Sequence, residues 1–402
     1  MNFATKVLHG STCIDPFTGA SSVPIYQAST FHQFDLDQPG TYDYARSGNP
    51  TRHALEEAIA ALEGGARGFA FSSGMAAISS VFMLFSAGDH IVVAEDVYGG
   101  TFRFLTRVLS RMGISVTFVD ATQTEAVREA ITPATKGVYL ETPSNPTLKV
   151  TDIAAVSAVA KEHGLLVIVD NTFLTPYYQR PLELGADVVI HSATKFIGGH
   201  SDVVAGLAVT RDAALGEQLY LIQNGMGAIL GVQDCWLVMR GLKTLKARLD
   251  VSTKSAGILA EWLSTHPGVS RVYYTGLADH PGHLVQQQQA SGHGAVLSFD
   301  VGSRERAKAL FDRVKLPIVA VSLGAVETIL SYPVMMSHAA MPAAEREVRG
   351  ITDGLIRLSA GLEDVDDLLA DLKQALDALP PLSSVQPQQS AQPQQKEAFS
   401  RA

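Results

Sequence analysis

The sequence predicts an α/β protein with a mainly parallel sheet in a large domain, followed by a smaller C-terminal α/β domain. From about residue 51 to 245, short apolar runs of strand length alternate with segments of helical periodicity. Such alternation is typical of a parallel sheet with helices on both faces. A second α/β pattern runs from about 246 to 379, and a chain of 402 residues is long enough for two domains.

The first 50 residues lack the periodicity of a helix or a strand and contain many Gly, Pro, Ser and Thr residues. A segment of this length is too long for a plain loop inside a compact domain. We therefore interpret residues 1–50 as an arm that packs on a neighbouring subunit, with a loosely ordered start as the alternative. The aromatic segments 24–26 and 42–44 favour the arm.

The elements of the large domain, 51–245, follow from periodicity. Apolar residues at helical spacing over 54–62 predict a helix, which Gly64 and Gly65 terminate. Further helices are expected to begin near Gly74 and Thr101. The predicted strands cover 68–71, 90–93, 115–119, 137–140, 165–169 and 187–190.

The rest of the chain forms a connecting helix and the smaller domain, 246–379. The pattern over 233–262 predicts one long helix between the domains. The clearest strands of the second domain are 295–299 and 354–359, and the glutamine run 286–289 is interpreted as a solvated helix face. The segment 380–402, rich in Gln, Pro and Ser, is predicted to be disordered.

Composition and charge argue against several classes of function. A formal net charge of −9 disfavours a nucleic-acid-binding surface, and no apolar run is long enough to span a membrane. The chain begins without the basic and apolar segments of a secretory signal. Cys13 and Cys235 cannot form a disulfide framework, so we expect a reduced, cytoplasmic protein. The histidines, including His191 and His200, lack the paired spacing of metal ligands.

Two candidate catalytic residues follow predicted strands. Ligands of parallel sheets bind beyond the carboxyl ends of the strands, which is where Asp170 and Lys195 lie in the sequence. The carboxylate of Asp170 could hold a positively charged ring nitrogen, although an Asp in a turn is common. Lys195 stands among hydroxyls and glycines and is a candidate for a Schiff base with a carbonyl, whereas most lone lysines are solvated charges.

Further features belong to the same edge of the predicted sheet. Gly74 opens a helix directly after a strand, and free N–H groups at a helix N-terminus suit a phosphate, although an ordinary strand–helix turn has the same pattern. Ser192 and Thr194 add hydroxyl donors for that anion. Tyr98, beyond the strand 90–93, could stack on a planar ring or simply pack. Together with the carboxylate and the lysine, these features match pyridoxal 5′-phosphate.

One charged residue of the smaller domain stands inside an apolar strand. Arg357 interrupts the run Leu355-Ile-Arg-Leu358, and a buried arginine needs an anionic partner. The partner could be a structural carboxylate, but the α-carboxylate of an amino acid fits a planar guanidinium equally well. Ser322 is a candidate to assist Arg357.

Several longer motifs resemble those of the Cys/Met-metabolism pyridoxal-phosphate enzymes, which include cystathionine β- and γ-lyases, cystathionine γ-synthase and methionine γ-lyase. The resemblance extends from about residue 5 to 378 and implies the PLP-dependent transferase fold (aspartate-aminotransferase-like, fold type I). The bacterial β-lyases are the most similar group, particularly over 320–342 and 350–359. The motifs are YDYARSGNPTRHALE, FSSGMAAI, EDVYGGTFR, ETPSNPTLKVTDI, VDNTF, HSATKFIGGHSDVVAG, VQDCWLVMRGLKTL, VSLGAVETILSYP and GLIRLSAGLE.

The resemblance implies roles for individual residues. Lys195 would bind the cofactor covalently, Asp170 would pair with its ring nitrogen, and Tyr98 would stack on the ring. The phosphate would be held by Gly74, Met75, Ser192 and Thr194, together with Tyr44 and Arg46 from a neighbouring subunit. The substrate carboxylate would be oriented by Asn145, Ser322 and Arg357. Lys195, Tyr98 and Tyr44 would take part in catalysis, and the family implies a homotetramer that is a dimer of dimers.

The implied reaction is β-elimination of cystathionine by a pyridoxal-phosphate-dependent carbon–sulfur lyase, as in methionine biosynthesis by trans-sulfuration. Gly100 occupies the position of the cysteine of methionine γ-lyases, and Val321 that of a glutamate of many γ-acting members. Both departures disfavour γ-chemistry, yet a γ-lyase, a γ-synthase or a bifunctional lyase remains an alternative. A non-catalytic cofactor-binding regulator is a more distant one. A Rossmann nucleotide-binding protein needs a Gly-x-Gly-x-x-Gly motif, which 72–77 lacks.

Overall fold

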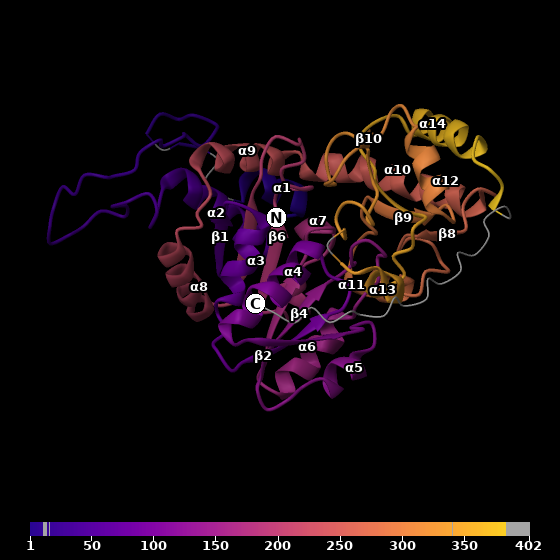
Figure 1. Cartoon of the computed structure of the whole chain (residues 1–402). Coiled ribbons are helices and arrows are strands. Elements are labelled where there is room, and N and C mark those ends of the chain that lie inside the picture. The colour runs from indigo at the N-terminus through magenta and orange to yellow at the C-terminus, as the bar shows by residue number, and fades with distance from the viewer. Residues whose placement is uncertain (11–13, 16, 340, 383–402) are drawn as a thin grey trace, which may run out of the picture.

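The computed structural model describes residues 1–10, 14–15, 17–339 and 341–382, and confirms the predicted α/β class. Two β-sheets, one of seven and one of five strands, lie in separate parts of the molecule (Figure 1). Each packs with its own cluster of buried apolar side chains, one built mainly from residues 55–249 and the other from 256–376. The tail 383–402 and Cys13 lie outside the described residues.

The larger sheet has the strand order β1-β7-β6-β5-β4-β2-β3. Its strands are β1 (Arg67–Phe71), β2 (His90–Ala94), β3 (Ser115–Val119), β4 (Thr135–Glu141), β5 (Leu166–Asp170), β6 (Val188–Ser192) and β7 (Gly206–Thr210). The five strands from β6 to β3 run parallel, whereas β7 pairs antiparallel with both β6 and β1.

Helices connect and cover this sheet. They are α2 (Pro50–Glu63), α3 (Gly74–Phe82), α4 (Gly99–Arg107), α5 (Thr124–Glu129), α6 (Ile153–Glu162), α7 (Thr175–Tyr178) and α8 (Ala213–Met226), with short 3₁₀ turns at Leu109–Met112 and Pro181–Leu184. The helix α2 shows why such elements begin and end where they do. The side chain of Asn49 accepts from the N–H of Thr51, and Gly64 ends the helix with φ +76°.

The predicted single helix over 233–262 is wrong, because the structure has α9 (Val232–Lys243) and α10 (Leu245–Thr265). The guanidinium of Arg248 donates to the carbonyl of Gly241 at 2.8 Å, and its Nε donates to the Thr244 hydroxyl at 3.0 Å. A continuous helix would direct the N–H of Leu245 to that same carbonyl. The break at Thr244 (φ −107°, ψ 2°) is therefore associated with a buried arginine rather than with Gly or Pro.

The smaller sheet has the order β10-β11-β12-β9-β8. Its elements are β8 (Arg271–Tyr273), α11 (His283–Gln289), β9 (Val296–Asp300), α12 (Arg304–Phe311), β10 (Ile318–Val319), β11 (Ile329–Ser331), α13 (Ala343–Val348), β12 (Leu355–Ser359) and α14 (Val365–Asp377). The glutamine run of α11 is not wholly solvated, since Gln286 is fully buried and donates to the carbonyl of Gly292 at 2.8 Å. Periodicity alone did not reveal this amide contact.

The N-terminal part of the chain leaves the body as a long extended segment (Figure 1). The short helix α1 (Phe3–His9) precedes this segment and packs on the body against α2 and α9, and the segment itself contains a single described β-bridge, between Thr30 and Tyr44. Phe34 and Leu36 are 94 % and 91 % exposed, which is unusual for large apolar side chains. Across the described residues, no helix is both long and apolar enough to cross a membrane.

Candidate active site

The carboxyl ends of β4, β5 and β6 meet at one edge of the larger sheet. In register, Glu141 lies opposite Asp170, and Asp170 lies opposite Ile190. Ser192 ends β6 two residues later, and Lys195 lies in the turn that follows. Because parallel strands end together, side chains far apart in the sequence share this edge, as the sequence analysis expected.

Lys195 is half-buried at this edge and faces the smaller sheet's unit. Its Nζ donates to Oγ of Ser322 at 2.7 Å. Burial and the nearby guanidinium of Arg357 lower the pKa of Lys195 to about 8. At neutral pH a larger fraction of this amine is therefore uncharged than for an exposed lysine, and the uncharged form is the nucleophile and the base.

Asp170 presents one carboxylate oxygen that its neighbours leave largely unoccupied. Oδ1 accepts from the backbone N–H of Thr172 at 3.0 Å and from its hydroxyl at 2.5 Å. Oδ2 has only a long contact, 3.5 Å, with the hydroxyl of Tyr139. Burial raises the pKa of Asp170, so a cationic N–H against Oδ2 would supply the charge that stabilises its ionised form.

An anion cradle is formed where α3 begins beside β6. Oγ of Ser73 caps the N–H of Ala76 at 3.0 Å. The N–H groups of Gly74 and Met75 have no hydrogen-bond acceptor among the described residues. A Cβ at Gly74 would lie 2.9 Å from Cβ of Ser192, so glycine permits this close approach. The N–H groups, the helix dipole and the hydroxyl of Ser192 thus suit a phosphate.

Thr194 lies in the same turn as Lys195 and stabilises that turn through hydrogen bonds to Ala205. Its Oγ1 accepts from the N–H of Ala205 at 3.0 Å and donates to the carbonyl of Ala205 at 3.3 Å. These bonds fix the turn between β6 and β7, which carries both the hydroxyl and the lysine. Binding a phosphate through Thr194 would require its hydroxyl proton to turn away from Ala205.

Tyr98 precedes α4 and remains 41 % exposed, so one face of its ring is available for stacking. Its backbone N–H donates to Oε2 of Glu141 at 2.8 Å. A Cβ at Gly100 would lie 2.4 Å from Cε1 of Tyr98 and 3.0 Å from the sulfur of Met75. Gly100 therefore allows the tyrosine ring and Met75 to come close together.

Arg357 lies inside β12 and holds a loop of the larger unit. It donates to Oδ1 of Asn145 at 2.8 Å, to the carbonyl of Ser322 at 2.7 Å and to Oγ of Ser331 at 3.2 Å. All three acceptors are neutral, and no described carboxylate lies within ion-pair distance of this buried guanidinium. Burial lowers the pKa of Arg357 to about 10. An incoming carboxylate would supply the missing negative charge.

Sequence reasoning missed several members of this cluster. Burial raises the pKa of Glu141, at the carboxyl end of β4, well above its usual value, and Asp170 adds to the rise. Thr172 was not identified, although it holds Asp170. His338 is buried, Ser337 contacts its Nδ1 at 2.9 Å, and burial lowers its pKa to about 4, so it is neutral. The sequence patterns of Thr172 and His338 differ little from those of ordinary loop residues.

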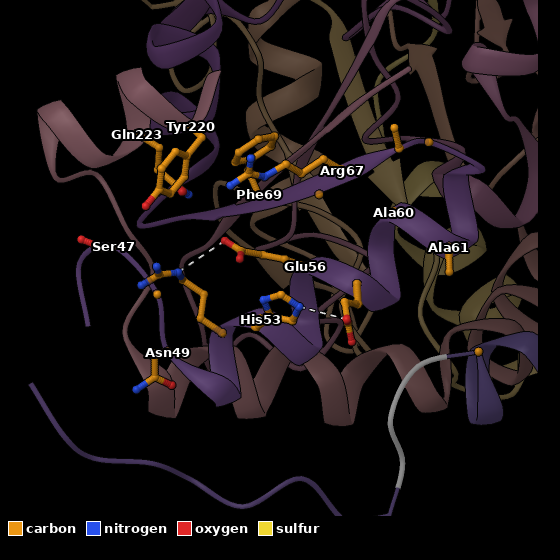
Figure 2. A pocket seen from close by; sticks show the side chains of 17 residues that line it. Ser47, Asn49, His53, Glu56, Ala60, Ala61, Arg67, Phe69, Tyr220 and Gln223 are labelled. Atoms are coloured by element: carbon orange, nitrogen blue, oxygen red, sulfur yellow. Dashed lines mark hydrogen bonds and ion pairs between the residues drawn. The ribbon is translucent and has the colours of Figure 1, made fainter. Parts of the chain in front are cut away.

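Two predicted phosphate ligands lie apart from this cluster within the chain. Arg46 donates to the carbonyl of Asn224 at 2.7 Å and lies 5.7 Å from the ring of Tyr44, which is 46 % exposed. A cavity of about 710 Å³ opens nearby, between the root of the arm at Ser47 and the helix α2. Figure 2 shows Arg67 beside the rings of Phe69 and Tyr220 in this cavity, which Lys195 does not line.

The residues at the edge of the sheet fit pyridoxal phosphate on structural grounds. Gly74 leaves room for an anion at a helix start, one oxygen of Asp170 remains open in a buried place, and the amine of Lys195 has a lowered pKa. Each requirement of the cofactor, namely phosphate, ring nitrogen and aldehyde, is matched by a different residue.

Comparisons with known proteins agree with this geometry. The model of the Cys/Met metabolism PLP-dependent enzyme family matches residues 4–377. A cystathionine beta-lyase of Bacillus subtilis (strain 168) is 62 % identical, covering 94 % of this chain and 97 % of that protein. A cystathionine gamma-lyase of the same organism is 53 % identical, covering 94 % and 100 %. The crystal structure of cystathionine gamma-lyase from Lactobacillus plantarum with L-serine superposes with a TM-score of 0.92 at 48 % identity, covering 94 % and 99 %.

Proposed function

This chain belongs to the Cys/Met metabolism PLP-dependent enzyme family, and from that premise we propose that it is a cystathionine β-lyase. The reaction converts L-cystathionine and water to homocysteine, pyruvate and ammonia. The observation that carries the choice is the 62 % identity with a cystathionine beta-lyase over 94 % of the chain. The fold is that of the PLP-dependent trans-sulfuration enzymes, as the sequence predicted.

The residues of the site can each be given a task. When bound, pyridoxal phosphate accepts the electron pair that is left when Cα of the substrate loses its proton. Arg357 and Asn145 would hold the α-carboxylate and so orient Cα toward Lys195. Lys195, with its lowered pKa, would remove the Cα proton as a general base. Asp170 would keep the facing ring nitrogen positively charged.

The bond that breaks joins Cβ to sulfur. Homocysteine leaves as the thiolate, and the protonated amine of Lys195 would return the proton that it took from Cα to the leaving sulfur. The remaining three-carbon enamine reacts with water to give pyruvate and ammonia. The burial of Arg357 and the partial burial of Lys195 would restrict water at the reacting atoms.

A cystathionine γ-lyase is the second candidate, because a relative of that description is 53 % identical over 94 % of the chain. γ-Elimination requires a further proton removal at Cβ and therefore more acid–base groups near the substrate. In this chain Val321 precedes Ser322 and is 63 % exposed, and it supplies no such group. This favours β-elimination.

The site is expected to be completed by a second copy of the chain, in a homotetramer. The exposed Phe34 and Leu36 and the extended arm support a subunit contact. Tyr44 and Arg46 would then reach the phosphate of the neighbouring subunit's cofactor. We assign residues 1–50 to the arm, 51–245 to the cofactor-binding domain and 246–379 to the small domain. Cys235 is a buried free thiol, which suits a cytoplasmic protein.

Product analysis tests the proposed reaction. The purified protein, supplied with pyridoxal phosphate, is incubated with L-cystathionine, and the thiols and keto acids are separated and quantified. We expect homocysteine and pyruvate in equal amounts. Cysteine and 2-oxobutyrate as the only products would overturn the β-lyase assignment and favour the γ-lyase.

A further inference from the structure

Asp96 lies two residues before Tyr98 and is fully buried against a loop far along the chain. Its Oδ2 accepts hydrogen bonds from the hydroxyl of Ser144, at 2.6 Å, and from that of Thr147. Asp96 is not the N-cap of α4, because that position is occupied by Tyr98. Among the described residues Asp96 accepts no hydrogen bond from α4, and its Oδ1 has no partner. Its hydrogen bonds thus serve the other loop.

The loop that Asp96 holds is a closed turn over 144–149. The N–H of Ser144 donates to the carbonyl of Lys149 at 2.9 Å, and the N–H of Lys149 donates to the Ser144 hydroxyl at 3.0 Å. The Ser144 hydroxyl in turn donates a hydrogen bond to the carboxylate of Asp96. A chain of hydrogen bonds therefore connects the turn to this carboxylate. The ion pair of Lys149 with Glu95, at 2.9 Å, adds a second tie between the same two segments.

The same turn carries Asn145, the residue that contacts Arg357. Asn145 stands between the two residues that Asp96 holds, and its Oδ1 accepts from Arg357 at 2.8 Å. From the small unit, Oγ of Ser298 donates to the carbonyl of Pro146 at 2.7 Å. The position of the Asn145 amide is therefore set from both sides, by Asp96 in one unit and by Arg357 and Ser298 in the other.

The free-energy cost of burying the Asp96 carboxylate indicates that its contacts with the turn have a role. A carboxylate without water loses solvation, and burial raises the pKa of Asp96, which two hydroxyl donors and the charge of Lys149 only partly offset. A neutral side chain could fill the same space without that cost. A charged acceptor, however, orients two hydroxyls more strongly than a neutral one does.

We propose that Asp96 is a positioning residue for the substrate's α-carboxylate: it fixes the turn 144–149 so that Asn145 and Arg357 together form a rigid carboxylate clamp. The proposal rests on the proposed function, because it assumes an amino-acid substrate. The proposal also connects the clamp to the segment that carries Tyr98. Residues 95 and 96 of that segment bind the turn 144–149, and the backbone N–H of Tyr98 donates to Glu141 at the end of β4.

The test uses the full-length holoenzyme and the substitution Asp96→Asn, which keeps the shape and removes the charge. We expect the KM for cystathionine to rise about tenfold, because a change of this size corresponds to the loss of roughly one charged hydrogen bond. We expect kcat to fall less than about twofold. The dissociation constant of L-alanine, followed by the absorbance of the holoenzyme, should rise by the same factor. L-Alanine has the α-amino and carboxylate groups but no leaving group.

Asp187→Asn is the matched control. Asp187 is also buried and accepts from the N–H of Val167 at 2.8 Å. It directly precedes β6, whereas Lys195 follows the other end of that strand. Its loss should lower the midpoint of thermal unfolding and leave both constants unchanged. Equal rises of KM in the two variants would show a general loss of stability and would overturn the proposal.

A double-mutant cycle with Asn145→Ala separates positioning from bulk structure. If Asp96 acts through Asn145, the double variant should bind L-alanine no more weakly than Asn145→Ala alone. Independent, multiplicative losses would contradict the proposal. Thr147→Val, which deletes one hydroxyl, provides the same cycle if Asp96→Asn does not fold, with an expected rise of about threefold. The L-alanine titration remains decisive even if the wild-type protein does not cleave cystathionine, so the two proposals fail separately.

Discussion

Nζ of Lys195 donates to Oγ of Ser322 at 2.7 Å, although the two residues lie 127 positions apart and belong to different halves of the molecule. Ser322 adopts φ +92°, a conformation that L-residues rarely adopt. The adjacent loop approaches the lysine closely, since a Cβ at Gly324 would lie 2.6 Å from the backbone nitrogen of Phe196. The hydroxyl of Ser322 is therefore directed at the amine by a strained, closely packed loop.

The lowered pKa of Lys195 predicts how the apo-protein captures its cofactor. Only the neutral amine attacks the aldehyde, and with a pKa of about 8 this form dominates above pH 8 rather than above 10.5. The capture rate, measured by the growth of cofactor absorbance after mixing, should rise from pH 6.5 and level off near pH 9. A rate that is still rising tenfold per pH unit between 9 and 10 would show an ordinary lysine.

Asp170→Asn should preserve the fold and weaken catalysis. The amide has nearly the shape of the carboxylate but cannot balance a positive ring nitrogen, so we expect kcat to fall on the order of 10²-fold or more. Steady-state kinetics and the absorbance maximum of the bound cofactor provide the two readouts. Asp187→Asn, at the opposite end of β6, is the control and should change neither. An unchanged kcat in Asp170→Asn would remove this residue from the mechanism.

Gly74→Ala tests the phosphate cradle. The added methyl group would lie 2.9 Å from Cβ of Ser192, so α3 must move away from β6. We expect the dissociation constant of pyridoxal phosphate to rise about tenfold, which equilibrium dialysis can measure. Gly257→Ala is the control, since a Cβ at this position in α10 meets nothing within 4 Å. It should retain the cofactor normally and raise stability by about 0.5–1 kcal/mol.

Arg357→Lys tests the carboxylate clamp. Lysine keeps the charge but cannot donate simultaneously to Asn145, Ser322 and a planar carboxylate, so the KM for cystathionine should rise about 10²-fold. Arg306→Lys alters another buried arginine of the small unit, whose acceptors are the carbonyls of Val301 and Gly268. It should lower the thermal midpoint only. A similar KM in both variants would contradict a role for Arg357 in substrate binding.

Much of the site could be predicted because its parts follow strands of one sheet. Asp170 and Lys195 are 25 positions apart, yet the parallel register of β5 and β6 brings their edges together, which the strand-end rule anticipates. Gly74 was recognisable for the same reason, since a glycine between a strand and a helix marks a place of close approach. In these cases the local pattern contained the physical cause.

Other parts depend on contacts that no local pattern contains. The bond between Arg357 and Asn145 spans 212 positions and requires the small sheet to sit against the large one. The break between α9 and α10 depends on the side chain of Arg248, the fourth residue of α10, within a segment predicted as one continuous helix. The burial of Gln286 depends on the carbonyl of Gly292. In each case a polar side chain finds its hydrogen-bond acceptor at another position of the sequence, and hydrophobic periodicity does not detect such partners.

The covalent attachment of the cofactor is the most direct test of the whole account. The holoenzyme is reduced with borohydride, digested, and analysed by mass spectrometry for the peptide that carries the reduced pyridoxyl phosphate group. We predict a single labelled peptide containing Lys195, with the label on its Nζ. A label on another lysine, or none at all on a protein that has been supplied with the cofactor, would contradict the assignment of this site.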